Sequence, residues 1–194
     1  MIHETSEVSK DAKIGKNVKI WSLSRIREGA VIGNNCIIGS NVYIDHHVKI
    51  GSNVKIQNNA LIFYKTVIES GVFIGPAVCF TNDKYPRATN LRGELKTTKD
   101  WKVGKIFVKK GASIGAGSIL LPGIKVGSYS MVGAGSVVTK SVPEHALVVG
   151  NPAKILNYIC FQGHILKKKI KNTFNYSIFY CNLCKNKIKI KNEK

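Results

Sequence analysis

Residues 32–62, IGNNCIIGSNVYIDHHVKIGSNVKIQNNALI, decide the fold, because an isoleucine returns at every sixth position. The same spacing of aliphatic residues runs over 8–74 and resumes over 108–138. A second column, four residues after the first, holds small or β-branched residues such as Cys36 and Val42. A fixed short period predicts a solenoid, since each unit can bury its apolar face only against its neighbours.

Each six-residue unit has the composition of a short strand followed by a tight turn. Residues 32–37 and 50–55 show the pattern clearly, with Gly and Asn after the aliphatic residue. Gly and Asn tolerate the positive φ of a tight corner, and β-branched residues suit strands. We therefore expect an all-β solenoid.

This pattern resembles the hexapeptide repeat of the left-handed parallel β-helix, in which three units form one triangular coil. The resemblance implies the left hand, because right-handed crossovers are the general rule. We expect the β-helix over 1–152, with four coils before a break in the pattern and two after it. The break predicts an inserted loop at 80–107, and loops of this length are usually functional. Residues 153–194 form a basic C-terminal tail.

The net charge of +19 does not indicate nucleic-acid binding. Residues 151–194 hold ten lysines and one acidic residue, so about half of the net charge lies in the tail. The other lysines are scattered, without an arginine-rich or aromatic-interleaved patch. No stretch has the length of a membrane span and no signal-peptide pattern is visible, so we expect a cytoplasmic protein that binds neither nucleic acid nor membrane.

Stacking of the coils predicts a polar corner where the loop begins. Residues eighteen apart should lie on one edge of successive coils, about 4.8 Å apart. Counting back by eighteen from the start of the loop collects titratable and aromatic side chains beside a long loop, which is the usual setting of a site. This edge is predicted to carry His46, His47, Tyr64, Lys65, Asn82 and Asp83.

A second column consists of small residues, with 115–117 (Gly-Ala-Gly) one coil below 133–135 (Gly-Ala-Gly). Corners without side chains let a long thin ligand lie against backbone amides. The glycines could equally serve only the turns.

Several longer blocks resemble the nucleotide-sugar 3-N-acetyltransferases, which acetylate the 3-amino group of UDP- or dTDP-linked sugars for O-antigen and S-layer glycans. The most specific block is VFIGPAVCFTNDKYPRA at 72–88, coupled with QNNALIFYK at 57–65. VKKGASIGAGSILLPGIKVG at 108–127 and VGAGSVVTKSVPEHALVVGNPAK at 132–154 complete the resemblance. The resemblance implies acetyl-CoA as co-substrate and a homotrimer with coenzyme A between subunits.

The resemblance also implies roles for individual residues. Asn82 matches the residue that holds the reacting amine, and Arg87 is expected to meet a phosphate or carboxylate. The substrate-binding candidates are His46, Tyr64, Lys65, Asp83, Lys84 and Arg87. The coenzyme A candidates are Gly115, Ala116, Gly133, Ala134, Gly150, Asn151, Pro152 and Lys154.

Three cations predicted near Asn82, namely Lys65, Lys84 and Arg87, favour UDP-2-acetamido-3-amino-glucuronate, whose carboxylate an arginine can grip. A dTDP-linked 3-amino-deoxyhexose and an O-acetyltransferase activity are the alternatives. Direct attack by a free amine is preferred over His46 acting as a base through water.

The tail carries Cys160, then Cys181-x-x-Cys184, which resembles a small zinc knuckle in which His164 replaces one cysteine. A relict knuckle without metal is the preferred interpretation, and zinc binding is the alternative. The lysine-rich end from Lys185 is expected to fray.

Overall fold

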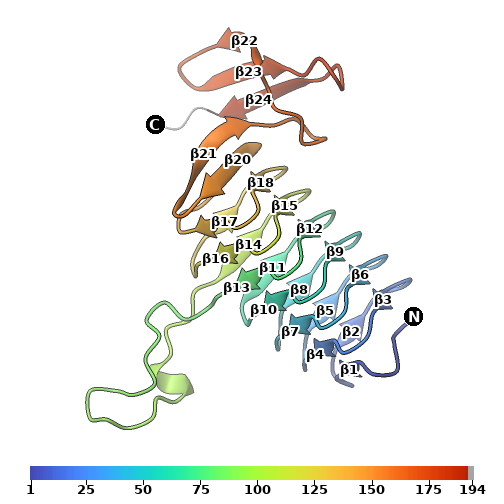
Figure 1. Ribbon diagram of the computed structural model, residues 1–194, viewed down its shortest axis with the longest axis vertical. Coiled ribbons are helices and arrows are strands. Elements are labelled where there is room, and N and C mark those ends of the chain that lie inside the picture. The colour runs from blue at the N-terminus through green and yellow to red at the C-terminus, as the bar shows by residue number, and fades with distance from the viewer. Residues whose placement is uncertain (192–194) are drawn as a thin grey trace.

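The computed structural model describes residues 1–191 and shows a stack of short strands with a small sheet at its C-terminal end (Figure 1). Three sheets run along the stack, and within each sheet the strands of successive coils pair in parallel. This is the predicted left-handed parallel β-helix.

The strands are two or three residues long in most coils. The seven-stranded sheet contains β1 (Glu7–Val8), β4 (Arg25–Ile26), β7 (Tyr43–Ile44), β10 (Leu61–Ile62), β13 (Cys79–Phe80), β16 (Ile119–Leu120) and β19 (Val137–Val138). The six-stranded sheet contains β2 (Lys13–Ile14), β5 (Val31–Ile32), β8 (Lys49–Ile50), β11 (Thr66–Ile68), β14 (Ile106–Val108) and β17 (Lys125–Val126). The eight-stranded sheet contains β3 (Lys19–Ile20), β6 (Ile37–Ile38), β9 (Lys55–Ile56), β12 (Phe73–Ile74), β15 (Ser113–Ile114), β18 (Met131–Val132), β20 (Ala146–Gly150) and β21 (Ala153–Tyr158).

The eighteen-residue register holds before the loop, as in the pairing of Ile44 with Ile62. At the corners Asn35 and Asn53 have φ of 57° and 58°, the left-handed conformation that Asn accepts more readily than most residues. The side-chain amide of Asn35 donates to that of Asn53 at 3.3 Å, so the corners are also tied from coil to coil.

The core lies inside the triangle and is built from the repeating aliphatic residue. Ile38, Ile56 and Ile74 are fully buried, whereas the residue before each of them faces outward. Burying one such side chain contributes roughly 1.5–3 kcal/mol, so the repeat itself supplies the stability of the solenoid.

The inserted loop lies between β13 and β14 and therefore spans 81–105. Its sequence-based limits of 80–107 included Phe80, Ile106 and Phe107, which are strand residues. The loop projects away from the solenoid and carries the 3-10 helix η1 (Thr98–Asp100) (Figure 1). It is the only helix within residues 1–191. No helix in this part of the chain is long and apolar enough to cross a membrane.

The C-terminal end is more ordered than the sequence suggested. β21 pairs with β20 and extends the eight-stranded sheet beyond residue 152. A separate antiparallel sheet follows, formed by β22 (Lys168–Asn172), β23 (Tyr176–Tyr180) and β24 (Lys187–Lys191). The expected fraying from Lys185 is wrong over β24, whose isoleucines are buried; residues 192–194 lie outside the described part.

Candidate functional site

The candidate site lies at the corner between the seven-stranded and six-stranded sheets, where the loop leaves and returns. Asp83 and Val103 form an antiparallel bridge, and the backbone N–H of Gly104 donates to the carbonyl of Asn82 at 2.9 Å. The two ends of the loop are therefore tied together, and Asn82 is held at its base.

A cavity of about 880 Å³ opens beside this base. Its walls come from the loop, from the turn after β10 in the preceding coil and from the turns of the next two coils. The lining includes Phe63, Asn82, Asp83, Lys84, Tyr85, Pro122, Thr139 and Lys140. The volume falls in the range of ligand pockets, and the neutral amide of Asn82 and the charge of Lys140 are polar groups within a mostly apolar wall.

The second part of the predicted site is an aromatic stack on the same edge of the solenoid, at the turns of the two preceding coils. The rings of His46 and Tyr64 stack with centroids 4.2 Å apart, which agrees with their predicted coil-to-coil register. Trp101, from the returning end of the loop, lies 6.1 Å from the Tyr64 ring, and Lys65 Nζ lies 5.5 Å from its centroid. The stack thus joins the loop to the solenoid.

Asp45 is a site residue that the sequence reasoning missed. Its carboxylate is buried and accepts hydrogen bonds from Arg27 Nη1 at 2.9 Å, from the backbone N–H of His46 at 2.8 Å and from that of Tyr64 at 3.0 Å. The Nδ1 atom of His46 lies 2.8 Å from the same carboxylate. An interruption of the repeat could have revealed Asp45. It follows Ile44 at the position of the repeat where many other units have Gly, as Gly33 follows Ile32.

These contacts decide the ionisation of Asp45. Burial raises the pKa of the carboxyl, but the hydrogen bonds from His46 and Tyr64 outweigh it and hold the pKa below its usual value. A charged Asp45 orients the imidazole of His46 through Nδ1, which leaves Nε2 as the atom that could accept a proton.

The candidate substrate residues divide into two groups. Asn82, Asp83 and Lys84 line the cavity, although Asp83 also accepts from the backbone N–H of Tyr85 at 2.9 Å and so shapes the turn. Among residues 1–191, the lining does not include His46, Tyr64, Lys65 or Arg87.

The predicted cluster of three cations is therefore not assembled in the cavity. Arg87 is exposed and donates to the carbonyl of Pro86 at 2.9 Å, and Lys65 lies over Tyr64. Only Lys84 of the three lines the cavity, where Lys140 joins it. Lys140 was missed because the stacking count ran toward the N-terminus only.

The small-residue column lies at the other edge of the seven-stranded sheet. A side chain at Gly115 would meet the backbone nitrogen of Ala134 at 2.5 Å, and one at Gly133 would meet the Val149 side chain at 2.6 Å. Coil packing alone therefore requires Gly115, and a larger residue at Gly133 would have to displace the Val149 side chain. Ala116 and Ala134 are exposed, so their small size leaves an open corner that a ligand could use.

The coil-exit segment continues this edge. Gly150, with φ of 99°, joins β20 to β21, and a cis peptide precedes Pro152. Gly150, Asn151 and Pro152 are exposed, and so is Lys154.

The repeats of this chain match those of a known family. The family model described as bacterial transferase hexapeptide, six repeats, matches residues 11–46, 29–63 and 105–140. These stretches of the chain therefore consist of hexapeptide repeats. It is 58% identical over 57 residues to the dTDP-3-amino-3,6-dideoxy-alpha-D-galactopyranose 3-N-acetyltransferase of Aneurinibacillus thermoaerophilus, a match that covers 29% of this chain and 30% of that one.

Two further proteins resemble this chain over part of its length. The serine acetyltransferase of Buchnera aphidicola is 38% identical over 109 residues, covering 55% of this chain and 38% of that one. A solved mutant form of GDP-perosamine N-acetyl transferase from Caulobacter crescentus, in complex with CoA and GDP-perosamine, superposes with a TM-score of 0.52 at 23% identity, covering 79% of this chain and 54% of that one. The matches thus span about a third of the two curated relatives and about half of the solved structure.

Proposed function

We propose that this protein is an acetyl-CoA-dependent N-acetyltransferase acting on the 3-amino group of a nucleotide-linked amino sugar. The observation that carries the proposal is the position of Asn82, a neutral amide at the base of the loop and in the wall of the cavity. The 58% identical relative is named as an enzyme for this reaction on a dTDP-linked sugar.

Acetyl transfer to an amine needs little from the protein beyond positioning and charge stabilisation. The neutral amine attacks the thioester carbon, the tetrahedral oxyanion collapses, and the thiolate of coenzyme A leaves and takes up the proton that the amine loses. The amide of Asn82 can accept a hydrogen bond from the amine or donate one to the oxyanion. One well-aimed donor of this kind is worth on the order of 3 kcal/mol.

The open corner of Ala116 and Ala134 suits the extended arm of coenzyme A. This corner and the cavity flank opposite edges of the seven-stranded sheet, so a trimer packed through that sheet would bring the coenzyme corner of one subunit beside the cavity of the next. Lys84 and Lys140 in the cavity wall offer charge for the diphosphate of a nucleotide sugar.

The outward face of the seven-stranded sheet supports a homotrimer. Its exposed column is apolar over the last four strands, with Leu61, Cys79, Ile119 and Val137. The outward columns of the other two sheets include lysines in β8, β17, β3 and β9. Three such apolar faces packed around a threefold axis would cover one another and enclose the coenzyme corner.

We expect light scattering to give about three times the chain mass of 21.3 kDa at micromolar concentration. Leu61→Glu should shift the mass toward the monomer, whereas Lys49→Glu on the six-stranded sheet should not. A monomeric wild-type chain would exclude the inter-subunit coenzyme site.

The function is tested by thiol release from acetyl-CoA with paired nucleotide sugars. A 3-amino sugar should be acetylated at least about a hundredfold faster than its 3-hydroxy counterpart, because the cavity wall formed by the described residues holds no histidine to activate a hydroxyl, and its carboxylate, Asp83, already accepts from the backbone N–H of Tyr85. The competing O-acetyltransferase function rests on the Asp45–His46 pair, which resembles an oriented base. Faster reaction of the hydroxyl sugar would establish that alternative.

The same assay can compare two candidate substrates that differ in both nucleotide and sugar. The relative favours a dTDP-linked 3-amino-dideoxyhexose, and the cavity holds fewer cations than a sugar carboxylate plus a diphosphate would use. UDP-2-acetamido-3-amino-glucuronate, preferred on the sequence, is the second candidate. The ratio of the two kcat/KM values decides between them.

A further inference from the structure

The segment that follows β21 forms a second, very small core. Its buried side chains are Cys160, Leu166, Phe179, Cys181, Ile188 and Ile190. Phe179, Ile188 and Ile190 come from β23 and β24, and the other three come from the segments beside the sheet. Every residue of β22 is exposed. A core of this size is too small to be stable unaided, and small folds usually add a disulfide or a metal.

Two turns bring sulfur and nitrogen atoms to one point. In the first turn the backbone N–H groups of Gln162 and His164 donate to Cys160 Sγ at 3.4 and 3.3 Å. Gly163, with φ of 83°, lets this turn close, and its N–H donates to the carbonyl of Cys160 at 3.0 Å. The first turn is thus folded around the sulfur of Cys160 and directs it to one point.

The second turn follows β23 and presents Cys181 and Cys184. The backbone N–H of Cys181 donates to the carbonyl of Asn186 at 3.0 Å, and Lys185 adopts a φ of 57°. The backbone of Cys184 hydrogen bonds to the Cys181 sulfur, as the backbone N–H groups of Gln162 and His164 do to the sulfur of Cys160. In both turns, therefore, backbone groups hydrogen bond to a cysteine sulfur.

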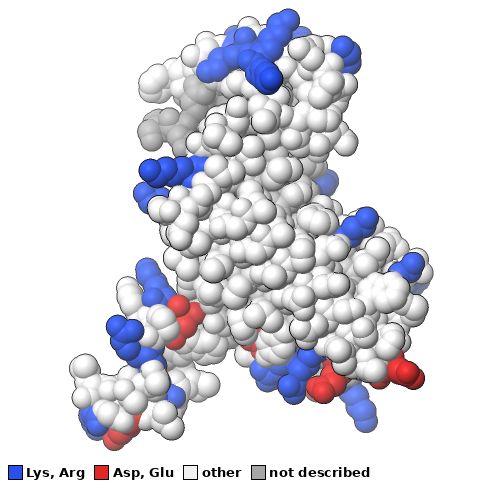
Figure 2. All heavy atoms as spheres, in the orientation of Figure 1, with Lys and Arg blue, Asp and Glu red and all other residues white. Residues whose placement is uncertain are grey.

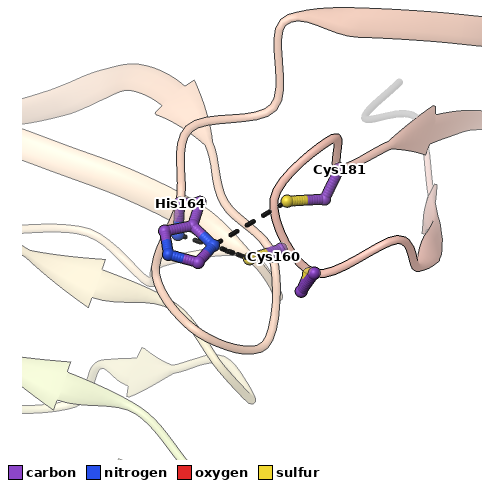
Figure 3. Close-up of side chains that lie close together, drawn as sticks. Cys160, His164 and Cys181 are labelled. Carbon is purple, nitrogen blue, oxygen red and sulfur yellow. Dashed lines mark hydrogen bonds between the residues drawn. The ribbon is translucent and has the colours of Figure 1, made fainter.

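Figure 3 shows the imidazole of His164 directed at the sulfurs of Cys160 and Cys181. Its Nδ1 lies 3.4 Å from the first sulfur and 3.8 Å from the second. All four ligand atoms, including that of Cys184, lie within 4.8 Å of one another. With Zn–S near 2.3 Å and Zn–N near 2.0–2.1 Å, a tetrahedral site has S–N edges of about 3.5 Å and S–S edges of about 3.8 Å.

We propose that Cys160, His164, Cys181 and Cys184 bind one structural zinc ion that holds the C-terminal sheet together. Three thiolates and one imidazole form a closed tetrahedral set, the type that structural zinc sites use. Cys160 and Cys181 are almost fully buried, so the ion would form the centre of the small core. This assignment replaces the metal-free knuckle preferred on the sequence, because the geometry puts His164 in the place of the missing cysteine.

Lysine side chains gather at the end of the molecule formed by the C-terminal sheet (Figure 2), and residues 153–191 contain no Asp or Glu that could compete as a ligand. A cation bound there must therefore be held by ligands that carry their own negative charge. Thiolates supply that charge, and three of them give the site a net charge of about −1 with zinc in place.

The site is tested by metal analysis of the full-length chain after removal of any affinity tag. We expect about one zinc per chain, and about none in the Cys181→Ser/Cys184→Ser double variant. Cys79→Ser, which removes a cysteine of β13 outside the cluster, should retain the zinc. Zinc below about a tenth per chain after exposure to zinc, iron in its place, or equal zinc in the double variant would overturn the proposal.

Cobalt substitution tests the site if the double variant does not fold. The cobalt form of the wild-type chain should show thiolate-to-cobalt charge-transfer bands and the visible absorption of a tetrahedral site. His164→Cys should keep a tetrahedral spectrum with stronger thiolate bands, whereas His164→Ala should weaken cobalt binding at least about tenfold. An octahedral spectrum, or no effect of either His164 variant, contradicts this ligand set.

Zinc removal should affect the appendage and leave the solenoid unchanged, since metal binding and folding are coupled in small domains. We expect a chelator to speed trypsin cleavage at Lys167–Lys171 at least about tenfold, while cleavage within the solenoid keeps its rate. Equal rates with and without chelator would exclude the structural role.

Discussion

Asn82→Ala is expected to lower kcat for sugar acetylation at least about tenfold, with a smaller change in KM. The reason is the loss of one amide contact to the reacting centre, a contact that strengthens as charge develops. The hydrogen bond that the structure shows for Asn82 is accepted by its backbone carbonyl, which alanine retains, so the fold should persist. Steady-state kinetics on variants of equal thermal stability measure the effect.

His46→Ala serves as the matched control, because His46 lies on the adjacent stack and not in the cavity wall. Its kcat should fall less than about threefold. If His46→Ala abolished turnover while Asn82→Ala did not, the Asp45–His46 pair would be the catalytic base, and the mechanism of direct amine attack would be wrong.

Asp45→Ala should destabilise the protein by about 2–4 kcal/mol, because it leaves the half-buried donors of Tyr64 and His46 without their acceptor and Arg27 with Glu28 as its ion-pair partner. The Arg27 side chain is partly exposed to solvent, so the expected loss of stability is smaller than for a fully buried ion pair. Denaturant unfolding at fixed protein concentration measures the difference. Asp11→Ala, an exposed carboxylate at another corner, should change stability by less than about 0.5 kcal/mol.

The contribution of Asp45 to the free energy of unfolding should decrease at low pH. Its pKa is lower in the folded state than the ordinary value of 3.8, so its stabilising contribution is complete above that value. The contribution is lost as the pH falls through the lower, folded-state pKa. The stability gap between wild type and Asp45→Ala should therefore narrow only below about pH 4, and a gap that narrows between about pH 7 and 5 would point to another group.

The solenoid could be predicted residue by residue because a strict repeat fixes register. The column containing Ile38 and Ile56 is buried as expected, and the eighteen-residue count correctly stacked Tyr64 on His46. The same count could not follow the loop, whose path depends on contacts such as that between Trp101 and Tyr64 rather than on a repeat. The count placed Lys65 near Asn82 and the resemblance placed Arg87 there, whereas the cavity wall contains Lys140 and neither of these two residues.

The C-terminal sheet was missed for a different reason. The alternation KIKIK at 187–191 is a strand pattern of period two, but the high lysine content suggested a solvated end. Its isoleucines are buried because β23 and the turns of the cysteine cluster provide a surface for them. Packing against the rest of the chain thus stabilises a strand at 187–191, where composition alone suggested a solvated end.

The central claim, acetyl transfer to a sugar amine beside Asn82, is tested most directly by a crystal structure with coenzyme A and a nucleotide-linked 3-amino sugar. The account predicts that the amine lies within hydrogen-bond distance of the Asn82 side chain, that the diphosphate lies near Lys84 or Lys140, and that coenzyme A runs along Ala116 and Ala134. An amine located beside His46, or a sugar bound outside the loop corner, would contradict it.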